Sequence, residues 1–530
     1  MSRVTVFAAV QVMDGTGAPG FVADVRVAGE RIADVGPCAE AHVADRVVDG
    51  SGLTLAPGFV DVHSHADLSP FLSIDDTTKL LQGVTTEVTG NCGASLLAGP
   101  LAAEDRPLLE RAARAAGAGP RLDRPADVLR ALDGARPVTN QAPLVGHAGI
   151  RRRVLGDVRR PPTAAEAAAM RGLVDEALDA GAFGLSSGLF YAPGAYAEPD
   201  ELAGLLEGRR GQAVVYASHI RNEGSGLVDA VAEFLAVGRA SGVRLELSHH
   251  KAAGLVNWGG TRQTLAMVAQ ARAEGVEVAL DAYPYGASST SVSANLPPWA
   301  LEGGRDAALA RLADPATRAR IRHDCEAGLP GWESMVAETG YDRMIVAHVP
   351  DHAGEGRTLA QIAQEAGVAP FDAMADVLVR SRLEAMMIVR SMDEADLRRV
   401  LADGQCWIGS DGTAYHEDGK PHPRLTGTFP RVLGPVVRQW GAFSLEEAVR
   451  RMTWGPAQWF AVPDRGRIAP GMVADLVLFD AGQVADGSTF ASPRLPPVGI
   501  AGVWLAGRQV VDGRRFLGER RGRRLRPAQT

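Results

Sequence analysis

The chain has 530 residues, of which 46% are hydrophobic and 22% charged, and its formal net charge is −8. This is an ordinary globular composition, long enough for one large domain and a smaller one. The acidic balance gives no electrostatic reason to expect a nucleic acid as partner. No apolar run approaches the ~20 residues of a membrane span, and we interpret the first ten residues as a strand and not as a signal peptide.

The four cysteines are too widely spaced to indicate a disulfide scaffold. They are Cys38, Cys92, Cys325 and Cys406, and no two of them form a CxxC pair. A zinc ribbon is therefore not expected either. We expect a protein of a reducing compartment, the cytoplasm.

Both ends of the chain are predicted to form short strands. Residues 1–57 alternate apolar and polar positions with glycines between the runs, and Ala474–Asp480 and Gly502–Gly513 repeat this pattern. Neither end holds enough strands for a stable sheet alone. We therefore expect residues 1–57 and 464–530 to form one small β-sandwich domain.

The middle of the chain, residues 58–463, alternates apolar strand-like runs with alanine-rich helical stretches. Thr163–Ala180 and Leu227–Ala240 have helical apolar spacing, and Thr163 with Glu166 matches a capping box. About eight repeats of strand and helix indicate an α/β fold, a (β/α)8 TIM barrel. The predicted strands are Phe59–His65, Thr86–Cys92, Pro143–Gly149, Phe183–Gly188, Val214–Arg221, Leu245–Lys251, Val276–Tyr283 and Trp407–Asp411.

Three segments depart from this alternation. Residues 286–342 hold no obvious barrel strand, and an insertion after a strand's C-terminal end would lie at the active-site mouth as a lid or wall. Met386–Val389 is interpreted as an extra strand. Residues 514–530 carry seven arginines, and like-charge blocks are typical of solvated tails.

The first predicted strand ends in a pair of histidines. Gly58–His65 has the sequence GFVDVHSH, so His63 and His65 are two residues apart. On a strand, residues i and i+2 point to the same face. Because neutral imidazoles are common ligands of zinc-like metals, this pair forms half a metal site.

Further metal-binding side chains stand at other predicted strand ends, where barrel enzymes carry their catalytic groups. Of 12 histidines and 4 cysteines in the chain, five fall at such ends, which is hard to assign to chance. All are good zinc ligands. The full set is His63, His65, Cys92 in GNCG, His219 in ASHIRNEG, His249 in LSHHK and Asp411 in IGSDG.

At these motifs the chain resembles the amidohydrolase superfamily and, within it, the N-acyl-D-amino-acid deacylases, or D-aminoacylases. The similarity covers nearly the whole length and includes APGFVDVHSHADL, TTEVTGNCGAS, PLVGHAGIR and DRGRIAPGMVADLVLFD. GNCG and SHHK are its most specific elements. Many superfamily members bridge two metals with a carbamylated lysine, and here that position resembles Cys92.

The resemblance implies zinc-dependent hydrolysis of the amide bond of N-acyl-D-amino acids, which gives a carboxylate and a free D-amino acid. It implies one tightly bound zinc and a second, weaker metal position. The ligands implied for the first are Cys92, His219 and His249, and those for the second are His63, His65 and Asp411. Asp411 would also take the proton of the attacking water and pass it to the leaving nitrogen.

Lys251 is the strongest candidate for binding the substrate carboxylate. It follows His249 by two residues and should share its strand face, in a chain with only three lysines. The resemblance also points there, with Tyr283 as hydroxyl partner. Ser289 and Arg221 are weaker candidates, and a surface lysine is the alternative for Lys251.

Other side chains have less support. Phe190 is expected to shape the pocket for the substrate side chain, although apolar residues usually only pack. Arg390 could meet an acidic substrate side chain, against the default of a surface arginine. His250 should lie opposite His249 and be structural, and His147 is either near the site or in the core.

Other functions stay open from the sequence. The first is a cyclic-amide hydrolase, like dihydroorotases or hydantoinases, which the missing lysine bridge counts against. A D-dipeptidase-like activity is another. A non-catalytic scaffold barrel is more remote, because such a protein should have lost ligands. We expect a small-molecule substrate with no nucleic acid and no membrane as partner, and the oligomeric state stays open.

Overall fold

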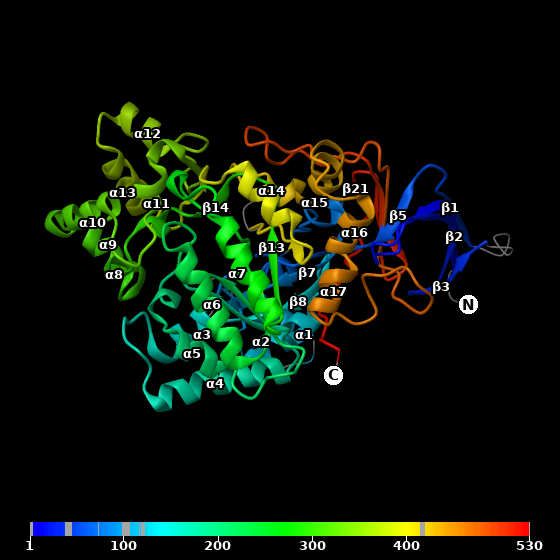
Figure 1. Ribbon diagram of the computed structural model, residues 1–530, viewed down its shortest axis with the longest axis horizontal. Coiled ribbons are helices and arrows are strands. Elements are labelled where there is room, and N and C mark those ends of the chain that lie inside the picture. The colour runs from blue at the N-terminus through cyan, green and yellow to red at the C-terminus, as the bar shows by residue number, and fades with distance from the viewer. Residues whose placement is uncertain are drawn as a thin grey trace.

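The computed structural model describes residues 4–37, 45–72, 74–97, 106–115, 117, 122–413 and 419–528. Three parts follow one another along its long axis, with the sheet of the chain ends on one side, the barrel in the middle and an inserted unit on the other (Figure 1). Cys38 lies outside the described residues. Within the described residues, no helix combines the length and the apolar character needed to cross a membrane.

The barrel strands are parallel and occur at all eight predicted positions. They form two runs, β6-β7-β8 and β17-β13-β12-β11-β10-β9. Leu144, between β8 and β9, donates from its N–H to the carbonyl of Thr89 at 2.8 Å, and the Asp411 N–H donates to the carbonyl of His63 at 2.7 Å. These bonds join both ends of the two runs into a closed barrel. The strands are β6 (Phe59–Asp61), β7 (Val84–Thr89), β8 (Asn140–Pro143), β9 (Val145–Gly146), β10 (Gly184–Gly188), β11 (Val215–His219), β12 (Arg244–Leu247), β13 (Val278–Ala282) and β17 (Cys406–Ile408).

Helices surround these strands. The predicted helix after Thr163 is present with its capping box, as Thr163 and Glu166 bond each other's backbone N–H. The third strand was predicted to extend to Gly149, which was wrong. It ends at Gly146, and His147 is the first residue of a helix. The helices of this part include α1 (Arg106–Ala115), α2 (Pro125–Gly134), α3 (His147–Leu155), α4 (Ala164–Asp179), α5 (Pro199–Leu205), α6 (Leu227–Ser241), α7 (Thr261–Ala273), α14 (Glu394–Ala402), α15 (Arg424–Arg431), α16 (Leu445–Met452) and α17 (Trp454–Trp459).

Both chain ends meet in one nine-stranded sheet of the described residues, in which β18 pairs antiparallel with β5. Its core includes Phe7 and Trp504, whose ring centroids are 4.7 Å apart. The pairing of strands from opposite termini is what the repeated pattern predicted. The strands are β1 (Val4–Val12), β2 (Phe21–Ala28), β3 (Arg31–Gly36), β4 (Arg46–Asp49), β5 (Thr54–Pro57), β18 (Leu476–Phe479), β19 (Ile500–Leu505), β20 (Arg508–Asp512) and β21 (Arg515–Phe516).

The inserted unit is longer than predicted. β14, β16 and β15 form a sheet of their own, so the unit continues past residue 342 to Val389. Residues 343–389 alternate strand and helix as the barrel does, which is why the sequence did not separate them. The extra strand at Met386–Val389 belongs to this sheet. The elements are β14 (Ser288–Ser291), α8 (Pro298–Leu301), α9 (Gly304–Ala313), α10 (Pro315–Ala327), α11 (Met335–Thr339), β15 (Met344–His348), α12 (Leu359–Ala366), α13 (Pro370–Arg380) and β16 (Met386–Val389).

The prediction of a solvated arginine-rich tail was wrong. The C-terminal segment leaves the sheet and ends against the barrel (Figure 1), where Leu525 donates from its N–H to the carbonyl of Gln141 at 2.8 Å. The Leu525 side chain is buried in the same apolar cluster as barrel residues. The Arg524 side chain is 1% exposed, and its guanidinium group binds both carboxylate oxygens of Asp133 at 2.7 and 2.6 Å. Specific partners, which composition does not reveal, fix this segment.

Replacing Arg524 by alanine should destabilise the protein by about 1.5–3 kcal/mol, because two charge-assisted hydrogen bonds and a buried stem are lost. The matched control is Arg526→Ala, since Arg526 is 64% exposed and 3.9 Å from the same carboxylate. It should cost less than about 0.5 kcal/mol. Urea unfolding midpoints measure both, and equal midpoints would contradict the role of Arg524.

Candidate metal centre and active site

Three side chains from three strand ends converge at the mouth of the barrel. The Cys92 sulfur lies 3.4 Å from Nε2 of His249, and Nε2 of His249 lies 3.0 Å from Nδ1 of His219. All three side chains are buried. Ligands held about 2.0–2.3 Å from a tetrahedral metal lie about 3.3–3.8 Å apart. The donor atoms of the three side chains lie within 4.8 Å of one another, so this set could hold one zinc ion.

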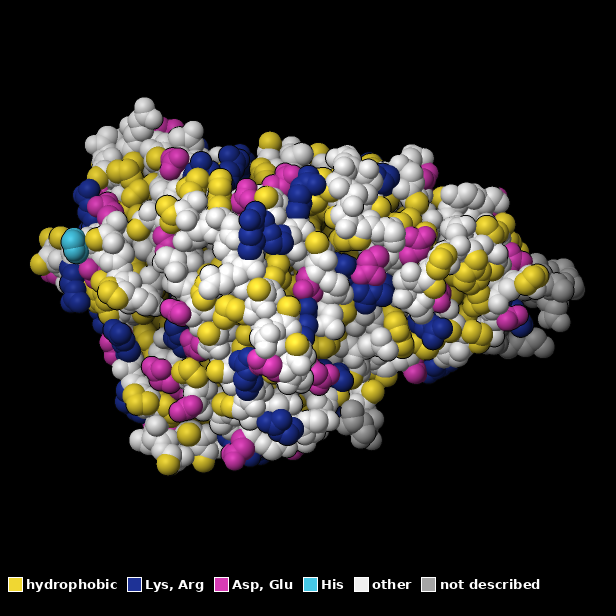
Figure 2. All heavy atoms as spheres, in the orientation of Figure 1, with side chains coloured by type: hydrophobic (Ala, Val, Ile, Leu, Met, Phe, Trp, Pro, Cys, Tyr) yellow, Lys and Arg dark blue, Asp and Glu magenta, His cyan; other side chains and the backbone are white. Residues whose placement is uncertain are grey.

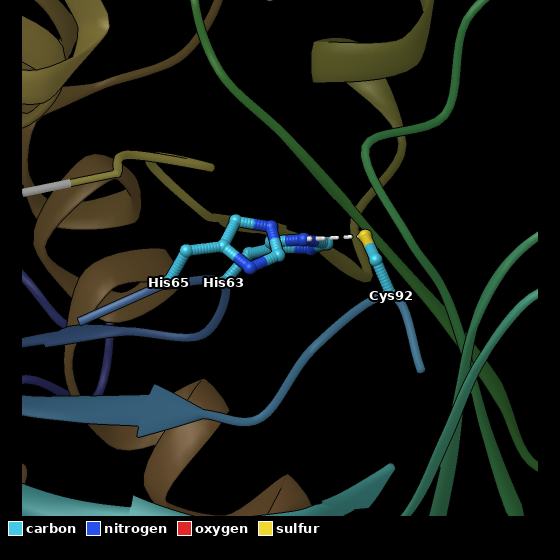
Figure 3. Close-up of side chains that lie close together, drawn as sticks. All are labelled: His63, His65 and Cys92. Carbon is cyan, nitrogen blue, oxygen red and sulfur yellow. Dashed lines mark hydrogen bonds between the residues drawn. The ribbon is translucent and has the colours of Figure 1, made fainter. Parts of the chain in front are cut away.

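A second group adjoins the first. Figure 3 shows the His63 and His65 rings beside the Cys92 sulfur, which lies 3.3 Å from Nε2 of His63. Asp411 Oδ1 is 3.2 Å from Nε2 of His65 and 3.7 Å from Nε2 of His63. These two histidines and the carboxylate offer a second metal position, which lies next to the Cys92 sulfur.

The backbone is strained at three of these six positions. Cys92, His249 and Asp411 have φ angles of +52°, +35° and +49°. Residues other than glycine seldom adopt this left-handed region, and such outliers gather at functional sites because the surrounding structure holds them there. The strain places the three side chains at the barrel mouth directly after their strands.

Neighbouring charges prepare the ligands for a metal. Burial raises the pKa of Cys92, but His63 and His249 outweigh it and hold that pKa well below its ordinary value, which favours the thiolate. Asp281 lies 3.2 Å from Nδ1 of His63 and accepts the N–H of His249 at 2.9 Å. A carboxylate on the far ring nitrogen orients a metal-binding imidazole, so Nε2 of His63 faces the site.

Asp411 is anchored from behind. The neighbouring Ser410 hydroxyl donates to Asp61 at 2.6 Å, and the fully buried Lys79 pairs with the same carboxylate oxygen at 2.5 Å. On its open side, Arg424 forms a 2.7 Å ion pair with Asp411 Oδ2. Burial alone would raise the pKa of Asp411, but Arg424 and then His249 keep it well below its usual range.

Lys251 lies at the site, as predicted, and is buried. Its Nζ is 2.5 Å from Glu223 Oε1 and 2.9 Å from Nδ1 of His249. Burial lowers the pKa of Lys251 and Glu223 raises it, with a net rise. The Lys251 amine is therefore protonated at neutral pH. The Tyr283 ring lies 6.0 Å from Nζ and 4.6 Å from the Arg424 guanidinium.

A cavity of about 520 Å³ opens on both groups of ligands, within the range of small-molecule sites. Phe190 and Ser289 line it as predicted, although the Ser289 hydroxyl donates to the carbonyl of Met387 at 2.9 Å. The Phe190 ring lies 5.6 Å from that of His219. Apolar side chains such as Phe190 line the cavity together with charged ones such as Lys251 and Arg424, and this mixture suits a substrate that has one charged end.

Two predicted substrate contacts are corrected by the structure. Arg221 binds Glu233 at 2.7 Å and the carbonyl of Ala197 at 2.6 Å, on a helix side of the barrel. Arg390 is exposed, and its guanidinium lies 5.6 Å from the Phe490 ring. Neither arginine lines the cavity. Each contacts other parts of the protein instead, which indicates a structural role.

The other two histidines discussed in the sequence analysis, His250 and His147, have partners outside the ligand set. His250 Nε2 is 2.8 Å from the hydroxyl of Thr264, and His147 Nε2 is 2.7 Å from Glu201 Oε1. His250 thus lies away from the ligands, as predicted, and His147 is held by a hydrogen bond with Glu201 at the start of α3.

Several cavity residues were not predicted from the sequence, and three of them are charged side chains next to the proposed site. Glu223 follows His219 by four residues within ASHIRNEG, Arg424 ends the run PHPR, and Glu333 comes from the inserted unit. Proximity to a ligand could have suggested Glu223. We found no sequence signal for Arg424 or Glu333, because both reach the cavity from segments that follow no barrel strand directly.

The buried carboxyl group of Glu333 should make KM depend on pH. Burial, and then the neighbouring Glu223 carboxylate, raise the pKa of Glu333 to about 8, so its carboxyl is neutral below that pH and ionises above it. A new negative charge on the cavity wall should repel an anionic substrate, and KM should rise above about pH 8. Glu333→Gln should flatten this rise while kcat keeps its pH profile, which steady-state kinetics from pH 6 to 9.5 would measure.

The amidohydrolase family profile matches residues 46–511 of this chain. A D-aminoacylase of Alcaligenes xylosoxydans xylosoxydans is 38% identical over 517 residues, covering 97% of this chain and 95% of the relative. An N-acyl-D-glutamate deacylase of the same organism is 39% identical over 94% and 91% of the two chains. The crystal structure of N-acyl-D-glutamate deacylase from Bordetella bronchiseptica, complexed with zinc and a phosphonate mimic of the tetrahedral intermediate, has a TM-score of 0.80 at 39% identity and covers 99% of this chain and 100% of the other.

The chain belongs to the amidohydrolase family of metal-dependent hydrolases. Within that family, its relatives at this level of identity are the D-aminoacylases and N-acyl-D-amino-acid deacylases. The barrel joined to a sheet of both termini is the architecture that it shares with them.

Proposed function

We propose that this protein is a zinc-dependent hydrolase that cleaves the amide bond of N-acyl-D-amino acids to a carboxylate and a free D-amino acid. One observation carries the proposal, namely the buried group of Cys92, His219 and His249 at the mouth of a cavity that also holds Lys251. The family relatives support the same reaction class.

The donor set fits zinc, since it combines a thiolate with two imidazoles at ligand spacing. Zinc, when bound, supplies a Lewis acid and lowers the pKa of water at its open position to about 7. The Asp411 carboxylate is ionised and lies within 4.8 Å of the donor nitrogen of His249, so it would accept the proton of the attacking water. The protonated carboxyl then delivers that proton to the leaving amide nitrogen.

We infer that the substrate carboxylate is held by two cations that line the same cavity. Lys251 and Arg424 flank the Tyr283 ring, and both are buried, so each charge acts at low effective dielectric. A carboxylate placed between them would satisfy Lys251 without breaking its pair with Glu223, because an ammonium group has three donors. This clamp fixes the scissile amide relative to the ligand set.

The test is turnover of N-acetylated amino acids by metal-depleted and zinc-loaded protein. We expect release of the D-amino acid only after zinc loading, with the L-enantiomers as the stereochemical control. Equal turnover by the two preparations would reject the proposal. A hydantoin in the same panel tests the cyclic-amide alternative, which gains no support from a cavity that has Cys92 where a bridging lysine would be.

Lys251→Met should raise KM for N-acetyl-D-leucine by about 10–100-fold, the equivalent of about 1.5–3 kcal/mol for a charge-assisted bond. The specific readout is the preference for the free acid over the corresponding C-terminal carboxamide. The wild type should prefer the acid, and the variant should lose that preference. Lys420→Met is the control for removal of a lysine, and a preserved preference in Lys251→Met would contradict the clamp.

A reducing compartment, the cytoplasm, suits this protein. The described cysteines Cys92, Cys325 and Cys406 are free thiols, and the first of them is a proposed zinc ligand that oxidation would destroy. Charged side chains of both signs are mixed over the face seen in Figure 2, which supports a small molecule rather than a polyanion as partner.

A further inference from the structure

The inserted unit contains a second cluster of metal-binding side chains. Four groups of at least three such side chains occur among the described residues, and three of them belong to the active centre. The fourth stands apart and consists of His348, His352 and Glu355. His348 ends β15, and the other two lie in the loop that leads to α12.

The donor atoms of this cluster lie close enough together to share one ion, since those of all three residues are within 4.8 Å of one another. Glu355 Oε1 lies 3.4 Å from Nδ1 of His348 and 3.0 Å from Nδ1 of His352. Ligands about 2.0–2.2 Å from a tetrahedral ion are about 3.3–3.6 Å apart. The distances match those within the Cys92, His219 and His249 group, which are 3.0 and 3.4 Å.

The carboxylate is also oriented for this role. Glu355 Oε1 accepts the N–H of Val349 at 3.0 Å, and an anchored carboxylate is what a preformed metal site requires. The side chains of Glu355 and His348 are 10% and 15% exposed, whereas that of His352 is 52% exposed. The cluster thus has two shielded ligands and one at the surface, which leaves a path for an ion and its remaining waters.

We propose that His348, His352 and Glu355 bind one divalent first-row transition metal, such as Zn²⁺, at a site separate from the active centre. Two imidazoles and a carboxylate suit these metals better than Mg²⁺ or Ca²⁺, which prefer oxygen ligands. The site joins the end of β15 to the following loop.

The position of the site connects it with the cavity wall. Lys420 donates from its N–H to the carbonyl of Ala347 at 2.8 Å, and the described segment from Gly419 leads on to Arg424. His348 itself lines a small cavity together with Asp411 and Arg424. A bound ion therefore fixes the inserted unit where it meets the segment that carries Arg424.

The test is the zinc content of the full-length protein after equilibrium dialysis against Zn²⁺. The wild type should retain one more zinc per chain than the double variant His348→Ala/His352→Ala. His323→Ala is the matched control, because His323 is an exposed histidine on α10 of the same inserted unit, and it should keep the wild-type count. Equal zinc counts in the wild type and the double variant would overturn the proposal.

A second measurement separates loss of this site from loss of the fold. With Co²⁺ in place of Zn²⁺, a sulfur-to-metal charge-transfer band reports the Cys92 site, and the double variant should keep that band while it loses absorption from the nitrogen and oxygen site. If the band disappears as well, Glu355→Gln decides, because glutamine keeps the acceptor for Val349 but lacks the charge. It should weaken binding of the additional ion, and an unchanged titration would overturn the proposal.

Discussion

Replacing Cys92 by alanine is expected to remove the tightly bound zinc and to lower kcat/KM by about 10³-fold, since Lewis-acid assistance is worth several kcal/mol and each 1.36 kcal/mol is tenfold. The remaining His219 and His249 lie 3.0 Å apart but provide only two neutral ligands. No thiolate then balances the charge of the ion, so affinity should fall together with activity. Zinc per chain, by atomic emission, and turnover of N-acetyl-D-leucine measure the two effects.

The matched control is Cys325→Ala. Cys325 is also a buried free thiol, but it lies in the inserted unit and bonds the carbonyl of Asn295 at 3.1 Å. This variant should keep its zinc and its kcat/KM even if it is somewhat less stable. Full zinc content and turnover in Cys92→Ala would show that the sulfur is not a ligand.

The positions of the metal-binding residues could be predicted because they obey a local rule. A parallel barrel brings the carboxyl ends of its strands to one face. His63, Cys92, His219 and His249 lie at the ends of β6, β7, β11 and β12 or at most three residues after them, so all four reach that face. The structure brings all four within contact. Their roles as ligands and the role of Asp411 as base stay predictions that the metal and activity measurements test.

The same rule failed where the strand stopped. Arg221 was a weaker candidate for the substrate carboxylate. β11 ends at His219, so Arg221 lies beyond the strand, where its side chain binds Glu233. Lys251 follows β12, which ends at Leu247, and it reaches the site through its contact with Glu223 and not through a strand face. Side chains beyond a strand end depend on loop geometry, which periodicity does not encode.

Contacts between residues that are far apart in the chain could not be predicted from the sequence either. Arg424, at the start of α15, binds Asp411, and the C-terminal Arg524 binds Asp133, which lies 391 residues earlier in the chain. Composition classified the tail by its charge, whereas the fold uses one of its arginines as a buried anchor. In both cases the partner of a charge decided its role, and that partner is a property of the tertiary structure.

Lys79 and Arg424 show how the charges at the site stabilise one another. Lys79 binds Asp61 beneath Ser410, and Arg424 binds Asp411 from the cavity side. Asp411 is thereby held between a fixed backbone and a buried cation. The pKa of Asp411 is thereby held well below its usual range, so the carboxylate is ionised at neutral pH.

Asp411→Asn is therefore expected to lower kcat by about 10²–10⁴-fold, the usual contribution of a positioned general base. Asparagine keeps the shape and the bonding to Arg424 only in part, and it cannot accept a proton. KM should change by less than about tenfold, because Lys251 still binds the substrate carboxylate. The Cys92, His219 and His249 group is untouched, so the tightly bound zinc should remain.

The comparison that isolates the base is Asp67→Asn. Asp67 is a second carboxyl group on the wall of the same cavity, where burial raises its pKa to about 6. Its replacement should lower kcat by less than about tenfold, as expected for a group that acts through its neighbours. If Asp411→Asn retained zinc and turned over substrate as fast as Asp67→Asn, the proton would have to be accepted elsewhere, and Glu223 beside His249 would be the next side chain to replace.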